Sequence, residues 1–253
     1  MGNNTGLFKD KFCTYSSKDG EEDRIVEDFQ GLNDAISGDL DHQLSVLLCG
    51  RKPEDLIKDK NGEKSSSERG EHENTICSGV KTETEHPICK CMFYYDRQKH
   101  AGITCSPCFI EQPWTNISDK YEVVDYEFPM PYAHRIESIK SVDLVLKDRI
   151  TGDYYAVEVK QKNSHETISR MMAETLTYTA VLEYAGCFGM KDNKILLPAI
   201  AFFEDSIQFR KYKEYKESAN MEFGKMLKVI KVFKIVIIKN EKGLCMFRFE
   251  PEN

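Results

Sequence analysis

Two neighbouring strand-like segments, residues 141–146 and 155–160, constrain this chain more than any other feature. Side chains along a strand point alternately to opposite faces, so Asp143 lies on one face of the first segment and Glu158 and Lys160 on one face of the second. The remaining positions carry apolar or aromatic side chains: Val142, Leu144, Leu146, Tyr155, Val157 and Val159. The sequence therefore predicts a β-hairpin with one polar, solvent-exposed face and one core face.

The segment between the two strands, 148–153, is rich in turn-forming residues. If the turn is centred between Ile150 and Thr151, Asp143 lies directly across from Glu158, because both are equally far from that centre. Opposed side chains have Cβ atoms about 5 Å apart. Two carboxylates at that distance repel each other unless a cation lies between them, and a divalent ion with oxygen ligands at about 2.0–2.1 Å fits the space. We predict a divalent metal site with a lysine beside it.

An aspartate followed by Glu-x-Lys on the next strand resembles the PD-(D/E)xK nuclease superfamily, in which the acidic pair holds magnesium and the lysine assists the attacking water. The resemblance implies that Asp143, Glu158 and Lys160 are the catalytic residues. It also implies that the two acids and the Val159 carbonyl hold Mg²⁺ or Mn²⁺, with Gln161 as an accessory residue. Valine precedes the aspartate in place of proline, which the superfamily tolerates. The same charges also fit the solvated face of an ordinary hairpin.

The sequence on either side of the hairpin fits this superfamily. Asn163 and Glu166 form a capping-box pattern at the start of a helix expected to reach Gly186. Residues 195–203 are almost wholly apolar, which is typical of a strand buried on both faces in parallel pairing. With a further strand expected over 121–128, we predict an α/β fold with a restriction-endonuclease-like core, a mixed sheet in αβββαβ order.

Further acids could belong to the same site. Glu174 and Tyr178 are four residues apart and share a helix face. Their spacing resembles the Gln-x-x-x-Tyr element of RecB-type nucleases, with Glu in place of Gln. A capped helix start is expected near 65–74, and the resemblance implies one more active-site glutamate there, either Glu71 or Glu73. Each of these acids also fits a plain solvated surface.

Cysteine spacing is the second strong signal in the sequence. A Cys-x-Cys pair is followed by a Cys-x-x-Cys pair: Cys89, Cys91, Cys105 and Cys108. Four thiolates with this spacing suit tetrahedral zinc. Three further residues compete as ligands: Cys77, His86 and His100. We predict a structural zinc in an insertion spanning residues 85–113, with an iron–sulfur cluster as the alternative.

The two ends of the chain have different character. Residues 1–64 are predicted to contain a disordered start and then amphipathic helices over 21–49, and residues 65–253 to form the nuclease-like domain. Residues 207–242 carry ten lysines or arginines against four glutamates. A basic helix is expected over 208–225, followed by a hairpin over 232–249. Four basic residues of this helix are candidates for nucleic-acid binding, although plain solvation also explains them: Arg210, Lys211, Lys213 and Lys216.

Composition narrows the class of protein. The formal net charge of −7 argues against a protein that coats nucleic acid non-specifically. No stretch approaches the length of a membrane span, no signal peptide is evident, and nine cysteines is an odd number. We expect a soluble, cytoplasmic protein without a disulfide framework. Its expected function is metal-dependent hydrolysis of phosphodiester bonds in DNA; the alternative is a catalytically inactive nucleic-acid or protein binding module stabilised by zinc.

Overall fold

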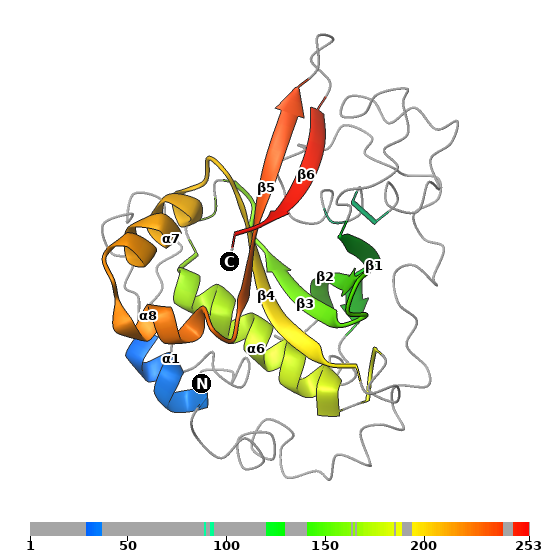
Figure 1. Ribbon diagram of the computed structural model, residues 1–253, viewed down its shortest axis with the longest axis horizontal. Coiled ribbons are helices and arrows are strands. Elements are labelled where there is room, and N and C mark those ends of the chain that lie inside the picture. Colours follow the sequence, from blue (N-terminus) through cyan, green and yellow to red (C-terminus); the bar gives the residue numbers. More distant parts are fainter. Residues whose placement is uncertain are drawn as a thin grey trace, which may run out of the picture.

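Figure 1 shows the computed structural model of the protein, which describes residues 29–36, 89, 92–93, 120–129, 141–162, 164, 166–184, 186–188, 194–239 and 245–252. The helices in this part of the chain are α1 (Phe29–Ile36), α6 (Ile168–Tyr184), α7 (Ile207–Glu217) and α8 (Met221–Met226). The strands are β1 (Tyr121–Pro129), β2 (Ser141–Asp148), β3 (Tyr154–Val159), β4 (Leu196–Phe203), β5 (Lys231–Lys239) and β6 (Cys245–Pro251).

All six strands form one mixed, curled sheet in the order β1 to β6. The first three make an antiparallel meander, β3, β4 and β5 are parallel neighbours, and β6 is antiparallel to β5. α6 connects β3 to β4, and α7 and α8 connect β4 to β5, as parallel neighbours require. The α/β class, the order of three strands, a helix and a strand, and the C-terminal hairpin are confirmed. The restriction-endonuclease-like assignment stays a prediction, and its first helix near residues 65–74 lies outside the described residues.

β4 is buried on both faces, as its apolar sequence predicts. Ile200 and Phe202 pack with α1, α6, α7 and α8 on one side of the sheet. Ala201 and Phe203 pack on the other side, where Phe93 also lies. The helices therefore cover one face, while Cys89, Met92 and Phe93 pack against the other. Truncating a fully buried aromatic such as Phe202 to alanine would cost about 3–5 kcal/mol of stability.

α6 starts later than the sequence predicts. Thr167 supplies its N-cap, because the Thr167 Oγ1 accepts the N–H of Arg170 at 3.2 Å. The capping-box start at Asn163 was therefore wrong. The end is close to the predicted one, since Gly186 follows the helix with a left-handed φ of +65°.

The single basic helix predicted over 208–225 was also wrong, because the structure has two helices there. Ala219 lies between α7 and α8 with a φ of +54°, a left-handed conformation that a continuous helix cannot contain. Asn220 then caps α8, and its side chain accepts the N–H of Phe223 at 3.0 Å. The break turns α8 toward α1, where the rings of Phe29 and Phe223 lie 4.9 Å apart.

Candidate active site

The hairpin of β2 and β3 has the register predicted from the sequence. Leu144 pairs with Val157, and the same register carried one residue further sets Asp143 across from Glu158. The Oδ2 of Asp143 also accepts the N–H of Val159 at 2.7 Å. This hydrogen bond holds the aspartate against the end of β3.

The turn that sets this register is organised by Asp148. Its Oδ1 accepts the N–H groups of Ile150 at 2.8 Å and Thr151 at 3.2 Å, and Lys120 forms an ion pair with its Oδ2 at 3.3 Å. Burial raises the pKa of Asp148, but these hydrogen bonds and the lysine outweigh burial and leave the pKa below its usual value. Gly152 completes the turn with a φ of +78°, where other residues are strained.

The polar face of the hairpin is buried at Glu158 and Lys160 and half-buried at Asp143, which corrects the exposed face predicted from the sequence. Only 3% of Glu158 and 8% of Lys160 is exposed to solvent. α6 covers this face and is hydrogen-bonded to β3 and β4 beneath it. The Oγ1 of Thr175 donates to the Ala156 carbonyl at 2.7 Å and accepts the Ala199 N–H at 3.1 Å. Glu158 and Lys160 therefore lie in a layer between sheet and helix, and Asp143 lies half-buried beside them.

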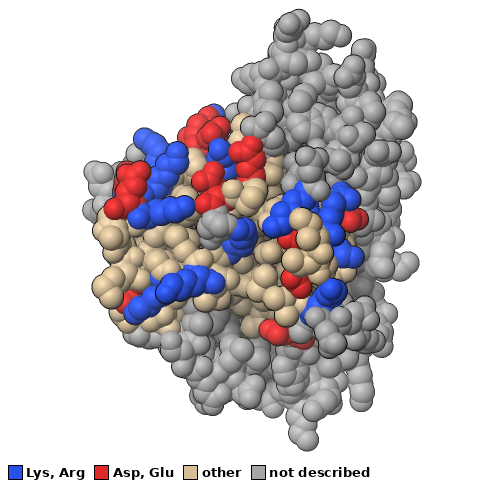
Figure 2. Space-filling model, viewed as in Figure 1, with Lys and Arg blue, Asp and Glu red and all other residues tan. Residues whose placement is uncertain are grey.

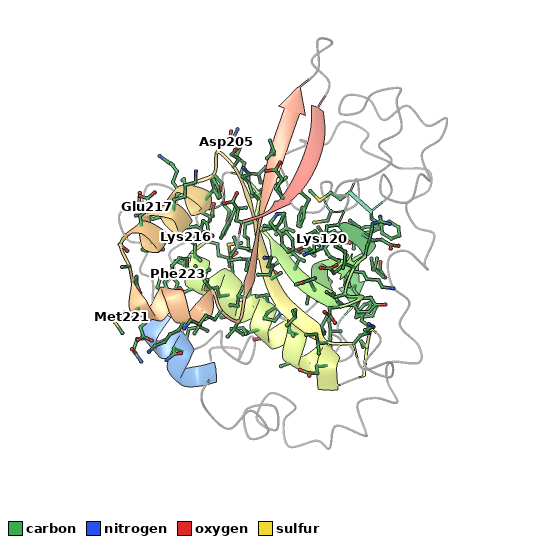
Figure 3. The ribbon with its side chains drawn as sticks, in the orientation of Figure 1. Lys120, Asp205, Lys216, Glu217, Met221 and Phe223 are labelled. Atoms are coloured by element: carbon green, nitrogen blue, oxygen red, sulfur yellow. The ribbon has the colours of Figure 1, made fainter. Side chains whose placement is uncertain are left out.

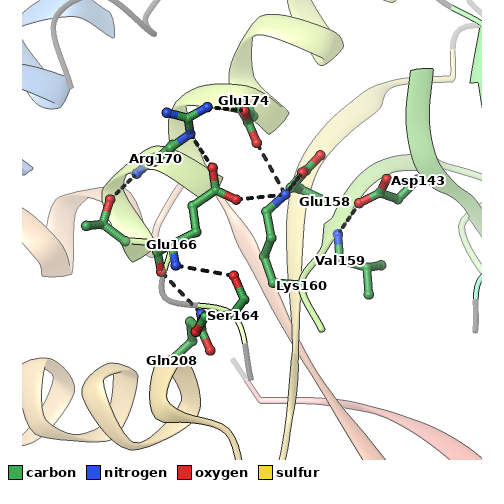
Figure 4. A network of polar contacts seen from close by, with 10 residues as sticks. Asp143, Glu158, Val159, Lys160, Ser164, Glu166, Arg170, Glu174 and Gln208 are labelled. Carbon is green, nitrogen blue, oxygen red and sulfur yellow. Dashed lines mark hydrogen bonds and ion pairs between the residues drawn. The ribbon is translucent and has the colours of Figure 1, made fainter. Parts of the chain in front are cut away.

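Lys160 is the centre of this layer, as Figure 4 shows. Its ammonium contacts the carboxylate of Glu158, that of Glu166 at 2.9 Å and that of Glu174 at 3.5 Å. The three glutamates come from β3, the segment before α6 and α6 itself. One cation thus joins three separate parts of the chain.

Arg170 is the second cation of the network. Its Nε forms an ion pair with Glu166, and its Nη2 lies 3.5 Å from the Oε1 of Glu174. Arg170 and Glu174, four residues apart, share a face of α6, and Glu166 lies two residues before the helix begins. Arg170 therefore holds together two carboxylates that would otherwise repel each other.

The network carries more negative than positive charge. Its carboxylates are those of Asp143, Glu158, Glu166 and Glu174, and its cations are Lys160 and Arg170. Four carboxylates against two cations leave a formal charge of −2 when all six groups are ionised. A divalent cation carries the charge that would balance this excess.

The excess charge and the burial shift the pKa values of the groups. Burial raises the pKa of Glu158 well above its usual value, and the charges of Asp143 and Glu174 add to the rise against the opposing effect of Lys160. Burial alone would lower the pKa of Lys160, but the surrounding carboxylates raise it well above normal. The lysine is therefore a fixed ammonium. Burial also raises the pKa of Tyr178, which keeps its phenol protonated.

One oxygen of the site is left over. The Oε2 of Glu158 is buried and has no hydrogen-bond partner among the described residues. A buried carboxylate oxygen without a partner is costly, and a metal ion would satisfy it. The part of the chain that the structure describes holds no group of three or more His, Cys, Asp or Glu side chains placed to bind a metal. Asp143 and Glu158 would therefore need backbone oxygens and water to complete an octahedral ion.

Of the predicted accessory residues, Glu174 lies in the network. Tyr178 is buried nearby, where the charges of the network raise the pKa of its phenol further. Gln161 is half-buried just after β3. Glu71 and Glu73 lie outside the described residues.

Glu166 and Arg170 were not predicted as site residues, although their spacing of four from each other and from Glu174 was visible in the sequence. Gln208 of α7 was missed as well. Its buried Nε2 donates to the Ser164 carbonyl at 2.5 Å and to that of Glu166 at 3.2 Å, and so holds the segment before α6. No local pattern announces this contact, because it joins residues far apart in the chain.

The predicted zinc ligands are mostly outside the described residues. Cys89 is described and is buried in the core cluster with Met92 and Phe93. Cys91, Cys105 and Cys108 are not described, so the zinc site stays a prediction.

The basic residues of α7 have partners of their own. Lys211 pairs with Glu214 at 3.3 Å, and Lys216 donates to the Tyr212 hydroxyl at 3.2 Å and to the Glu252 carbonyl at 3.1 Å. Lys213 lies 4.6 Å from the centre of the Phe209 ring, and Arg210 is exposed. Figure 2 shows acidic side chains among the basic ones on this face, and Figure 3 shows Lys216 and Glu217 on α7.

Among the described residues, every helix is too short or too polar to cross a lipid bilayer. No family model matches the sequence, and no solved structure matches the fold.

Proposed function

We propose that this protein is a metal-dependent nuclease that hydrolyses phosphodiester bonds, with DNA as its substrate. The observation that carries the proposal is the pairing of Asp143 with Glu158 across the hairpin, beside a buried Lys160 and with an excess of negative charge. Burial of charged groups at such a density costs stability, and proteins keep it at functional sites.

Asp143, Glu158 and the Val159 carbonyl would hold Mg²⁺ or Mn²⁺. When bound, the ion would lower the pKa of a water molecule and offset the charge that develops on the phosphate. The hydrogen bond from the Val159 N–H fixes the direction of the Asp143 carboxylate before any ion arrives. The partnerless Oε2 of Glu158 is the oxygen that an ion would approach.

Lys160 would act as a donor rather than as a base. The carboxylates around it raise its pKa well above normal, so the ammonium keeps its protons and cannot accept one from water. An ammonium beside the scissile phosphate would orient the attacking water and stabilise the negative charge of the transition state.

The nucleic acid would extend from this site over α7. Arg210, Lys211, Lys213 and Lys216 would contact phosphates along its backbone, which makes binding depend on salt. The zinc held by the four cysteines would fold the segment 85–113, and elemental analysis of the purified protein should then find about one zinc per chain. Iron in a brown protein would indicate an iron–sulfur cluster in place of zinc.

Cleavage of a supercoiled plasmid and of a single-stranded oligonucleotide tests the proposal. We expect the wild type to cut in millimolar Mg²⁺ and to stop in the presence of a chelator. The variants Asp143→Asn and Glu158→Gln should not cut, whereas Glu222→Gln, which alters a glutamate paired with Lys225 at 2.7 Å on α8, should cut normally. A wild type that binds no divalent ion and cuts nothing would overturn the proposal.

A second candidate is a catalytically inactive module that binds nucleic acid or protein. The contact of the Lys160 ammonium with Glu158 favours it, because a cation of the protein itself already neutralises part of the acidic site. This candidate predicts salt-dependent binding of DNA without cleavage.

A further inference from the structure

The Lys160 ammonium contacts three glutamates that have different places in the proposed reaction. Glu158 is one of the proposed metal ligands, so this inference rests on the proposed function. Glu166 and Glu174 lie on the other side of the ammonium, at 2.9 Å and 3.5 Å. A divalent ion at the Oε2 of Glu158 would repel the ammonium on the Oε1 of the same carboxylate and weaken its hold there. In that state Lys160 would keep its place only through the other two glutamates.

Those two glutamates are held firmly. Arg170 binds both carboxylates, and all three side chains are at least four-fifths buried. The backbone of Glu166 is also fixed, because its N–H donates to the Ser164 Oγ at 3.2 Å and its carbonyl accepts from Gln208 at 3.2 Å. Glu166 and Glu174 therefore have little freedom to move, and their fixed carboxylates hold the Lys160 ammonium in place.

We propose that Glu166 and Arg170 are positioning residues, which hold the Lys160 ammonium at the reaction centre when a divalent ion takes over Glu158. Glu166 acts on Lys160 directly, and Arg170 acts by fixing the carboxylates of Glu166 and Glu174. In this proposal neither residue contacts the metal or the substrate. They keep the Lys160 ammonium next to a divalent ion that repels it.

The first test is a comparison of Glu166→Gln with the wild type in the full chain. The amide keeps the size of the side chain but removes the charge that holds the ammonium. We expect kcat to fall about tenfold or more, because a small displacement of a catalytic group is costly, while KM and Mg²⁺ affinity change less than about threefold. The matched control is Glu222→Gln, which should leave both constants unchanged. Loss of Mg²⁺ affinity in place of kcat would make Glu166 a metal ligand and overturn the inference.

A double-mutant cycle with Lys160→Ala gives the second test. If Glu166 works only through Lys160, then Glu166→Gln should cost nothing further once the lysine is absent. Arg170→Met should behave as Glu166→Gln does, and Arg170→Lys should recover part of the loss because it restores the charge. Equal losses of kcat in both backgrounds would show an independent role, structural or otherwise, and would overturn the inference.

The third test does not depend on cleavage. A lysine ammonium held by carboxylates gives an observable NMR signal from its N–H groups, and the Lys160 signal is identified by its loss in Lys160→Ala. We expect it to persist on addition of Mg²⁺ in the wild type and to disappear in Glu166→Gln. If the signal persists in the wild type and disappears in Glu166→Gln, but the wild type cuts nothing, the proposed function fails and the positioning stands. If the wild type cuts and Glu166→Gln keeps both its signal and its kcat, the positioning fails and the proposed function stands.

Discussion

Lys160 and Lys234 each form ion pairs with three glutamates, yet the two clusters differ in how deeply their side chains are buried. Lys234 of β5 lies 3.1 Å from Glu204, 3.2 Å from Glu250 and 3.5 Å from Glu252. The side chains of these partners are 22–51% exposed, whereas those of the three Lys160 partners are 4–10% exposed.

Burial opposes ionisation of Lys234, but hydrogen bonds to Glu204 and Glu250 raise its pKa, as is usual for a surface pair. The Lys160 cluster adds a fourth carboxylate, a second cation and an acid whose pKa burial raises strongly. The number of ion pairs therefore says little about function. What separates a candidate site from a surface network is the amount of charge that the fold removes from water.

The largest difference between the clusters should appear in metal binding and cleavage. Glu158→Gln should abolish binding of Mn²⁺ and Mg²⁺-dependent cleavage, because an amide carries no charge to offset the ion. Glu250→Gln should leave both unchanged, since water already surrounds its cluster. Calorimetric titration with Mn²⁺ and a plasmid cleavage assay would measure the two effects. Equal behaviour of the two variants would end the distinction between the clusters.

The next difference should appear in stability. Lys160→Ala removes the cation that three buried carboxylates share and should cost about 3 kcal/mol of the free energy of unfolding. Lys234→Ala should cost less than about 1 kcal/mol, because water screens its partners. Urea denaturation at pH 7 would give both values. If Lys234→Ala lowers the free energy of unfolding as much as Lys160→Ala does, solvent exposure does not determine the stability that these clusters contribute.

Exposed charges should matter for binding more than for stability. Changing Lys211, Lys213 and Lys216 together to glutamate should weaken DNA binding and flatten its salt dependence by a slope of about 0.9 for each phosphate that the protein no longer neutralises. The melting temperature should change little. A control that changes Lys225 of α8 and the nearby Lys228 to glutamate should keep the slope. An unaltered slope in the triple variant would assign the lysines of α7 to solvation.

The smallest effect concerns Asp148, which is buried like the acids around Lys160 but is held chiefly by N–H groups. Its pKa in the folded protein lies below the ordinary value of 3.8, so its contribution to stability is complete above that pH and is lost as the pH falls through the folded-state pKa. Asp148→Asn should therefore be about 1 kcal/mol less stable than the wild type at pH 7, and the difference should shrink below pH 4. Chemical denaturation across this range would show the convergence, and a constant difference would contradict it.

The sequence predicted those features of the fold that depend on local patterns. Alternation and turn composition placed Asp143 across from Glu158, and an apolar run identified β4 as a strand buried on both faces. The break at Ala219 was missed, although Ser218 and Asn220 on either side of it are residues favoured at helix ends.

The burial of the site was not predictable. Alternation shows which residues share a face of the hairpin, but it does not show that α6 lies over that face. Glu166 was interpreted as a helix cap, and its role as a partner of Lys160 depends on where α6 packs. The residues that extend the site, including Arg170 and Gln208, come together only through contacts between distant segments.

The Thr175 hydroxyl fixes the position of α6 on the sheet. The Ala156 carbonyl of β3 accepts a hydrogen bond from the Thr175 hydroxyl at 2.7 Å. The Oγ1 of Thr175 in turn accepts the N–H of Ala199, so one atom of α6 is tied to two adjacent strands. Glu174 precedes it by one position in the helix. The position of the glutamate is therefore fixed relative to both β3 and β4, because its neighbour in the helix is hydrogen-bonded to each strand.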